Sequence, residues 1–123
     1  MSYDLSIRAD DTYSRMAAKA PLASFIATLS SVKPNGTSGF VLDDPPKRWM
    51  EIDLELVSED GDYIGDDEGS SETEINCLRL HIPYGFFRED GFAEEYLPTA
   101  LAIAKHLGWT LLDEQTDETW PPE

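Results

Sequence analysis

The chain has 123 residues, of which 25 are Asp or Glu and 9 are Lys or Arg, so its formal net charge is −16 at pH 7. With 41% hydrophobic residues, three Trp, five Tyr and five Phe, the composition is that of a folded domain and excludes a disordered acidic chain, which would be poor in aromatic residues. The acidity also excludes nucleic acid and anionic membranes as partners, because binding to phosphate needs clustered Lys and Arg.

The first predicted elements are a short strand and a helix. Alternating apolar and polar residues predict a strand over residues 3–7. A helix is expected over about residues 12–30, with Asp10 or Asp11 as its N-cap. Pro21 lies inside that segment, and its missing N–H and its ring predict a kink or a break there.

The clearest strand covers residues 49–57. Glu51, Asp53 and Glu55 alternate with apolar residues, which is the period-2 pattern of a half-buried strand. The wider stretch from Asp43 to Glu74 holds thirteen carboxylates and two basic residues, and it therefore carries eleven of the sixteen net negative charges. A compact surface with this charge attracts cationic partners.

A second alternating strand is predicted over residues 75–82. A hairpin would pair it with the acidic strand, so Arg79 and His81 are expected on the same open face as the three acids. One of those acids could then hold His81 for acid–base chemistry while Arg79 binds an anion. Ordinary cross-strand ion pairs are the more common outcome of this residue pattern.

The last predicted elements are a helix whose regular part begins near Leu97 and a strand over residues 110–113. The order strand, helix, strand, strand, helix, strand predicts an α+β fold. The expected architecture is a ferredoxin-like split βαβ sandwich, in which an antiparallel sheet carries two helices on one face. We expect one domain over residues 1–113, followed by an acidic, Pro-ended tail over residues 114–123 that frays.

No cofactor, metal or membrane attachment is expected. Asp60 and Asp62 begin a stretch that is similar to a calcium loop, but Ile64 at position five has no oxygen ligand and Ser71 stands at position twelve, where that loop has a bidentate Glu. The single Cys77 cannot form an internal disulfide. Because no apolar run approaches the ~20 residues of a membrane span and the N-terminal residues lack the pattern of a secretory signal, we expect a cytoplasmic protein.

The small size, the acidic stretch over residues 51–74 and the closing segment over residues 102–115 resemble the small acidic immunity proteins with which bacteria neutralise toxins. The resemblance implies a non-enzymatic inhibitor that occludes a cationic toxin with a carboxylate surface. The closing segment contains no catalytic signature, so the resemblance assigns no role to any single residue.

We therefore predict that the protein binds a basic protein partner through its acidic strand and loop, with Trp49 as an aromatic anchor. The residues expected at this surface are Trp49, Glu51, Asp53, Glu55, Asp60, Asp62, Arg79 and His81. Two other interpretations stay open: the acids serve solubility alone, or the open face binds a small ligand or acts as an enzyme. A monomer or a homodimer is expected, and repulsion between two acidic faces argues against a dimer that meets through the open sheet.

Overall fold

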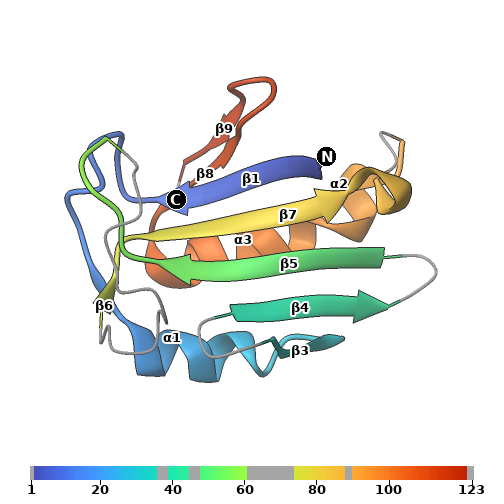
Figure 1. Cartoon of the computed structure of the whole chain (residues 1–123), viewed down its shortest axis with the longest axis horizontal. Helices are drawn as coiled ribbons and strands as arrows, with labels where there is room; N and C mark the ends of the chain where they lie inside the picture. The colour runs from blue at the N-terminus through green and yellow to red at the C-terminus, as the bar shows by residue number, and fades with distance from the viewer. Residues whose placement is uncertain (1, 36–38, 45–47, 61–73, 88–89, 122–123) are drawn as a thin grey trace.

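The computed structural model describes residues 2–35, 39–44, 48–60, 74–87 and 90–121, and it shows an α+β protein built on a large antiparallel sheet (Figure 1). The elements in chain order are β1 (Ser2–Arg8), β2 (Ala17–Ala18), α1 (Lys19–Ile26), β3 (Val32–Pro34), β4 (Gly39–Asp44), β5 (Arg48–Glu55), β6 (Glu74–Ile75), β7 (Cys77–Pro83), the 3-10 turn η1 (Tyr84–Phe86), α2 (Phe92–Glu95), α3 (Leu97–Leu107), β8 (Thr110–Asp113) and β9 (Thr119–Trp120). The seven strands of the sheet lie in the order β3-β4-β5-β7-β1-β8-β9, and β2 pairs separately with β6.

The sheet is wider than the four-stranded sheet that the sequence predicts. The expected strands correspond to β1, β5, β7 and β8, and these lie together in the order β5-β7-β1-β8. β3 and β4 extend the sheet beyond β5, whereas β9 pairs with β8 within the stretch that was expected to form a frayed tail. β3 and β9 have three and two residues, too few for an alternating pattern to be recognised in the sequence.

The first helix is shorter than predicted. α1 begins at Lys19, so Pro21 lies in its first turn, where an N–H would have no intrahelical acceptor in any case. Before it, the Asp10 carboxylate accepts hydrogen bonds from the backbone N–H groups of Thr12 and Ser14, at 3.1 and 3.0 Å. The expected helix start near Thr12 was wrong because Asp10 caps a loop, with the same chemistry that it would use to cap a helix.

The hydrophobic core lies on one side of the sheet. Residues that point to this side alternate along each central strand, as Met50 and Ile52 do on β5, and both are fully buried. Figure 1 shows α3 behind the sheet. α1 contacts α3, where the stacked rings of Phe25 and His106 have centroids 4.0 Å apart. α3 ends at Leu107, and the next residue, Gly108, has a φ of 70°, the left-handed conformation that glycine adopts readily. With the helices on one side, the charged side chains on the other side of the central strands, such as Asp53 and His81, are partly exposed to solvent.

The described part of the chain holds no helix with the length and apolar character that crossing a bilayer requires.

Candidate functional site

The solvent-facing side of the central strands brings together most of the predicted site residues. We call it the open face and define it by the outward-pointing residues of β1, β5 and β7. These are Asp4, Arg8, Glu51, Asp53, Glu55, Arg79 and His81, whereas Ser6 and Cys77 lie on the same side of the sheet but are buried. The register pairs Glu51 with His81 and Asp53 with Arg79, which confirms that the two basic residues share a face with the acidic strand.

β1 supplies a part of the open face that was not predicted from the sequence. It pairs with β7 so that Asp4 lies opposite His81 and Ser6 lies opposite Arg79. The alternation of Tyr3, Leu5 and Ile7 toward the core already indicates that Asp4 points outward. What the sequence did not provide was the position of β1 beside β7, because no local pattern determines the order of distant strands.

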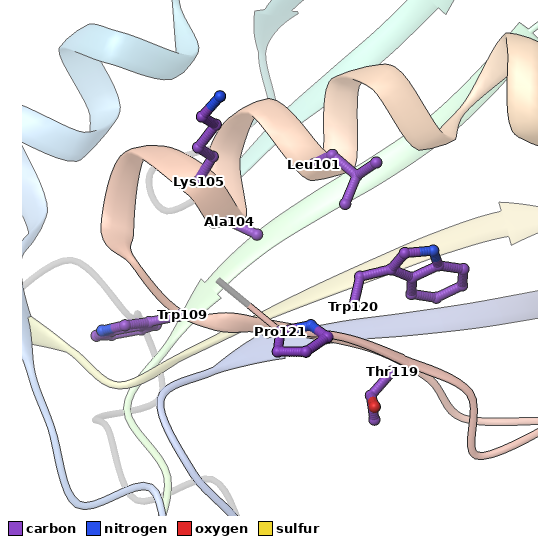
Figure 2. A pocket seen from close by; sticks show the side chains of 7 residues that line it. All are labelled: Leu101, Ala104, Lys105, Trp109, Thr119, Trp120 and Pro121. Atoms are coloured by element: carbon purple, nitrogen blue, oxygen red, sulfur yellow. The ribbon is translucent and has the colours of Figure 1, made fainter. Parts of the chain in front are cut away.

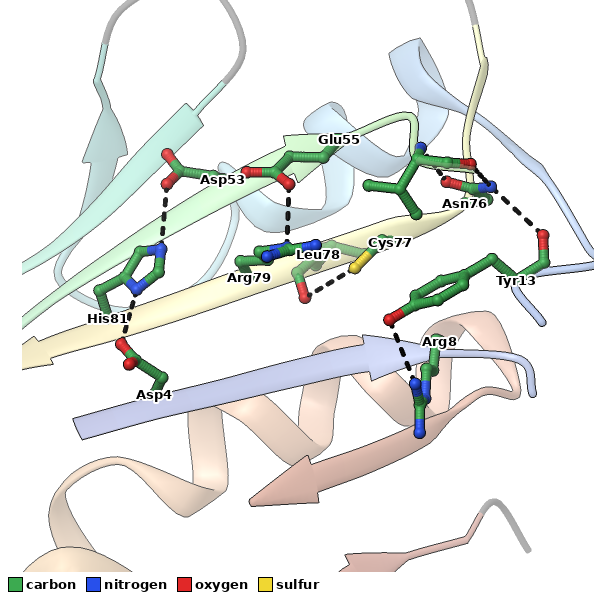
Figure 3. A network of polar contacts seen from close by, with 11 residues as sticks. Asp4, Arg8, Tyr13, Asp53, Glu55, Asn76, Cys77, Leu78, Arg79 and His81 are labelled. Carbon is green, nitrogen blue, oxygen red and sulfur yellow. Dashed lines mark hydrogen bonds and ion pairs between the residues drawn. The ribbon is translucent and has the colours of Figure 1, made fainter. Parts of the chain in front are cut away.

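His81 lies between two carboxylates (Figure 3). Its Nδ1 is 2.7 Å from Oδ1 of Asp4, and its Nε2 is 3.5 Å from Oδ2 of Asp53. Asp53 was one of the expected partners, whereas Asp4 was not. Since an ionised carboxylate can only accept a hydrogen bond, Nδ1 carries the proton toward Asp4. Both ring nitrogens thus face acids, and the contacts of His81 with Asp4 and Asp53 link β1 to β5 across β7.

Arg79 forms a cross-strand ion pair with Glu55. Its Nε lies 3.0 Å from Oε1 of Glu55, and both side chains are partly buried (Figure 3). Burial disfavours the charge of the guanidinium, but Glu55 and further neighbours outweigh burial and raise the pKa of Arg79. An anion bound by Arg79 would therefore have to compete with Glu55.

Two carboxylates at the centre of the open face, Asp53 and Glu55, are in surroundings that disfavour their ionised form. Burial raises the pKa of Asp53 against the attraction of His81, and Glu51 raises it further by repulsion. Burial likewise raises the pKa of Glu55 against the attraction of Arg79, and Asp53 adds to the effect. The cations already present do not fully compensate these charges, so an additional cation on the face would be attracted.

Other chemistry has less support on this face. Cys77 is fully buried, and burial raises the pKa of its thiol to about 11, so the thiol is protonated at neutral pH and is a poor nucleophile. Among the residues that the structure describes, no three His, Cys, Asp or Glu side chains form a group that could hold a metal ion. Of the calcium-like stretch, Asp60 is exposed in the turn after β5, and the rest, with Asp62, lies outside the described residues.

The predicted aromatic anchor lies at the far end of β5 from Asp60. The ring centroid of Trp49 is 6.3 Å from that of Phe86, and its backbone N–H donates to the Tyr96 hydroxyl at 3.3 Å. Trp49 is thus half-buried and fixed by neighbours. Tyr84, in the turn that follows β7, is more accessible because 48% of its surface is exposed. A partner on the open face would meet an aromatic group at this end.

Asp53→Asn is expected to stabilise the protein increasingly as the pH rises. The folded-state pKa of Asp53 lies above the ordinary 3.8, so its contribution to stability is fully present below that value and is lost as the pH rises through the folded-state pKa. Asn does not ionise, so the variant does not lose this contribution to stability as the pH rises. The free energy of unfolding of the variant, measured in urea, should therefore rise relative to wild type between about pH 3 and about pH 7.

Asp113→Asn provides a control with the opposite sign. Burial opposes the charge of Asp113, but hydrogen bonds from Tyr3, Gln115 and Thr116 outweigh burial and lower its pKa. Its contribution to stability is present above the ordinary 3.8 and is lost as the pH falls through the folded-state pKa, so this substitution should cost most near neutral pH. The same pH dependence for both variants would contradict the two assignments.

Comparisons with known proteins identify no relative. No protein-family model matches the chain, and no curated protein or solved structure is significantly similar to it. The function of the open face must be inferred from its own geometry and charge.

Proposed function

We propose that the protein is a non-enzymatic binding protein that acts in the bacterial cytoplasm, and that its open face binds a cationic protein in the manner of an immunity protein that occludes a toxin. The observation that carries this proposal is the row of outward carboxylates on β5, Glu51, Asp53 and Glu55, and the raised pKa of Asp53 and Glu55 supports it. A Lys or Arg from a partner would stabilise charges that the folded protein alone leaves unfavourable.

The arrangement of the face also favours protein binding. Its carboxylates lie on paired strands, which hold them at fixed positions, and the contacts of Arg79 and His81 orient them further. Groups that are ordered before binding lose little conformational freedom when the partner arrives. The exposed ring of Tyr84 and the half-buried ring of Trp49 would supply apolar contact beside the charges.

An enzyme that uses His81 as a base is the second candidate. The 2.7 Å contact with Asp4 favours it, because a carboxylate on Nδ1 orients an imidazole for proton transfer. The proximity of Nε2 to Asp53 disfavours it, because a substrate would have to displace that carboxylate. His81→Ala should abolish activity without unfolding the protein if this candidate is right.

We also propose that β5, β7, β1 and β8, together with α1 and α3, correspond to the ferredoxin-like split βαβ unit expected from the sequence. Their order in the sheet and their antiparallel pairing support this assignment. β3, β4 and β9 would then be additions at the edges, which broaden the sheet that carries the open face.

The proposed function is tested by capture from a lysate of the source organism with three immobilised proteins. These are the wild type, a face variant (Glu51→Gln, Asp53→Asn and Glu55→Gln) and a control variant (Asp11→Asn, Glu94→Gln and Glu118→Gln). The control removes the same charge from exposed acids outside the open face. We expect one basic protein to be retained in defined stoichiometry by the wild type and the control but not by the face variant. Equal retention by all three proteins would contradict the proposal.

A further inference from the structure

A cleft lies between the second half of α3 and the β9 segment, away from the open face (Figure 2). Its volume is about 450 Å³, and it is lined by Leu101, Ala104, Lys105, Trp109, Thr119, Trp120 and Pro121. This volume falls within the range of roughly 300–1,000 Å³ that is typical of small-molecule sites. The cleft exists because β9 folds back on β8, so it depends on the stretch that was expected from the sequence to form a frayed tail.

The lining of the cleft is mostly apolar and includes two indole rings. Leu101 and Ala104 project from α3 toward Trp120 and Pro121 (Figure 2). Trp109 is almost completely buried, so it forms a fixed part of the wall, whereas Trp120 is partly exposed. Rings at these positions offer faces and edges to a flat apolar molecule.

The seven lining residues include a single charged side chain, and its charge is positive. Lys105 is exposed, and Figure 2 shows its ammonium pointing away from Trp120. Its four-carbon stem is flexible, so the direction of the ammonium is not fixed. This cation is unexpected against a net charge of −16, which repels anions from the surface as a whole.

We propose that the cleft binds a small aromatic carboxylate, with its ring against Trp120 and Leu101 and its carboxylate at the Lys105 ammonium. This function goes beyond the binding of a cationic protein at the open face and uses none of the same residues. Because the net charge of the protein favours cations at any non-specific position, a preference for an anion at the cleft would identify a specific site.

The test uses three probes that share one ring system and differ in charge: naphthoate, naphthamide and naphthylmethylammonium. Each is titrated into the full-length protein, and the backbone amide and the three Trp indole N–H signals are followed by NMR. We expect saturable shifts at Trp109 and Trp120 and at the residues of α3, with Trp49 unaffected. Naphthoate should bind most tightly and naphthylmethylammonium most weakly.

Two substitutions of exposed lysines separate the cleft from the general charge. Lys105→Gln should weaken naphthoate binding about fivefold, which is the size expected for one exposed ion pair, and should leave naphthamide binding unchanged. Lys33→Gln removes the same charge from β3, where Nζ of Lys33 lies 3.4 Å from Oδ2 of Asp43. This substitution should change neither the affinity for naphthoate nor that for naphthamide. Trp120→Ala should weaken binding of all three probes because it removes one wall.

The proposal is overturned by any of three results. The first is a cationic probe that binds as tightly as naphthoate, which would indicate attraction to the protein's general charge. The second is the absence of saturation at the cleft up to millimolar naphthoate. The third is equal affinity of naphthoate for wild type and Lys105→Gln, which would leave the apolar ring as the sole determinant. None of these results depends on whether the open face binds a cationic protein.

Discussion

Neutralising Glu51, Asp53 and Glu55 together should slow association with a cationic partner by on the order of 10- to 100-fold at low ionic strength. These carboxylates lie side by side on β5, and their charges add at the approach of a positive surface. Asp53 and Glu55 should contribute most to affinity as well, since their raised pKa indicates that their charges lack full compensation. Stopped-flow or surface-binding kinetics with the captured partner measures the association rate constant directly.

The dependence on salt provides the control for this prediction. Screening by salt should slow the wild type strongly and the Glu51→Gln, Asp53→Asn, Glu55→Gln variant weakly, so that the two rates converge as salt increases. The variant with Asp11, Glu94 and Glu118 neutralised has the same net charge as the Glu51→Gln, Asp53→Asn, Glu55→Gln variant. Its association rate should nevertheless be close to that of the wild type. If both variants slow association equally, the total charge rather than the open face steers the partner.

Asn76→Ala should lower the free energy of unfolding by roughly 3 kcal/mol, a large share of the ~5–15 kcal/mol of a typical domain. Asn76 is 3% exposed and lies between β6 and β7. Its amide accepts a hydrogen bond from the Val57 N–H at 2.8 Å and donates to the Val57 carbonyl at 2.8 Å and to the Tyr13 carbonyl at 3.2 Å (Figure 3). Alanine would leave the backbone N–H and carbonyl of Val57 and the carbonyl of Tyr13 without the Asn76 amide as a hydrogen-bond partner. Because Val57 is buried, water cannot easily replace the amide there.

The chain provides a matched control for this substitution. Its other asparagine, Asn35, is exposed after β3, and Asn35→Ala should change the free energy of unfolding by less than about 0.5 kcal/mol. Urea denaturation of both variants and the wild type at the same pH gives the comparison. A cost for Asn76→Ala as small as that for Asn35→Ala would show that the buried amide contributes little to stability.

The sequence predicted those parts of the protein that have strong local patterns. The alternation along residues 49–57 predicted β5 and its outward acids, and the helix start predicted near Leu97 is the first residue of α3. The pairing of β5 with β7 followed because two alternating strands were separated by a single loop. Local alternation was therefore sufficient to predict that Arg79 and His81 share a face with the acidic strand.

The missed parts depend on contacts between distant residues. Asp4 faces His81 because β1 lies beside β7, a pairing that joins residues far apart in the chain and leaves no local pattern. The cleft required the return of β9 to β8, which two residues of strand in an acidic, Pro-ended stretch do not indicate. The predicted helix start near Thr12 failed for a different reason, since a carboxylate that caps a loop and one that caps a helix have the same sequence pattern.

The short strands at the two edges of the sheet have a consequence for how the protein behaves in a crowded cell. An edge strand exposes unpaired backbone groups, and a long, flat edge can recruit another chain and begin aggregation. Here one edge is three residues long and ends at Pro34, which lacks an N–H, and the other edge has two residues. Two copies that collide edge to edge would gain few backbone hydrogen bonds. The sheet can therefore have seven strands without an edge that templates fibre formation.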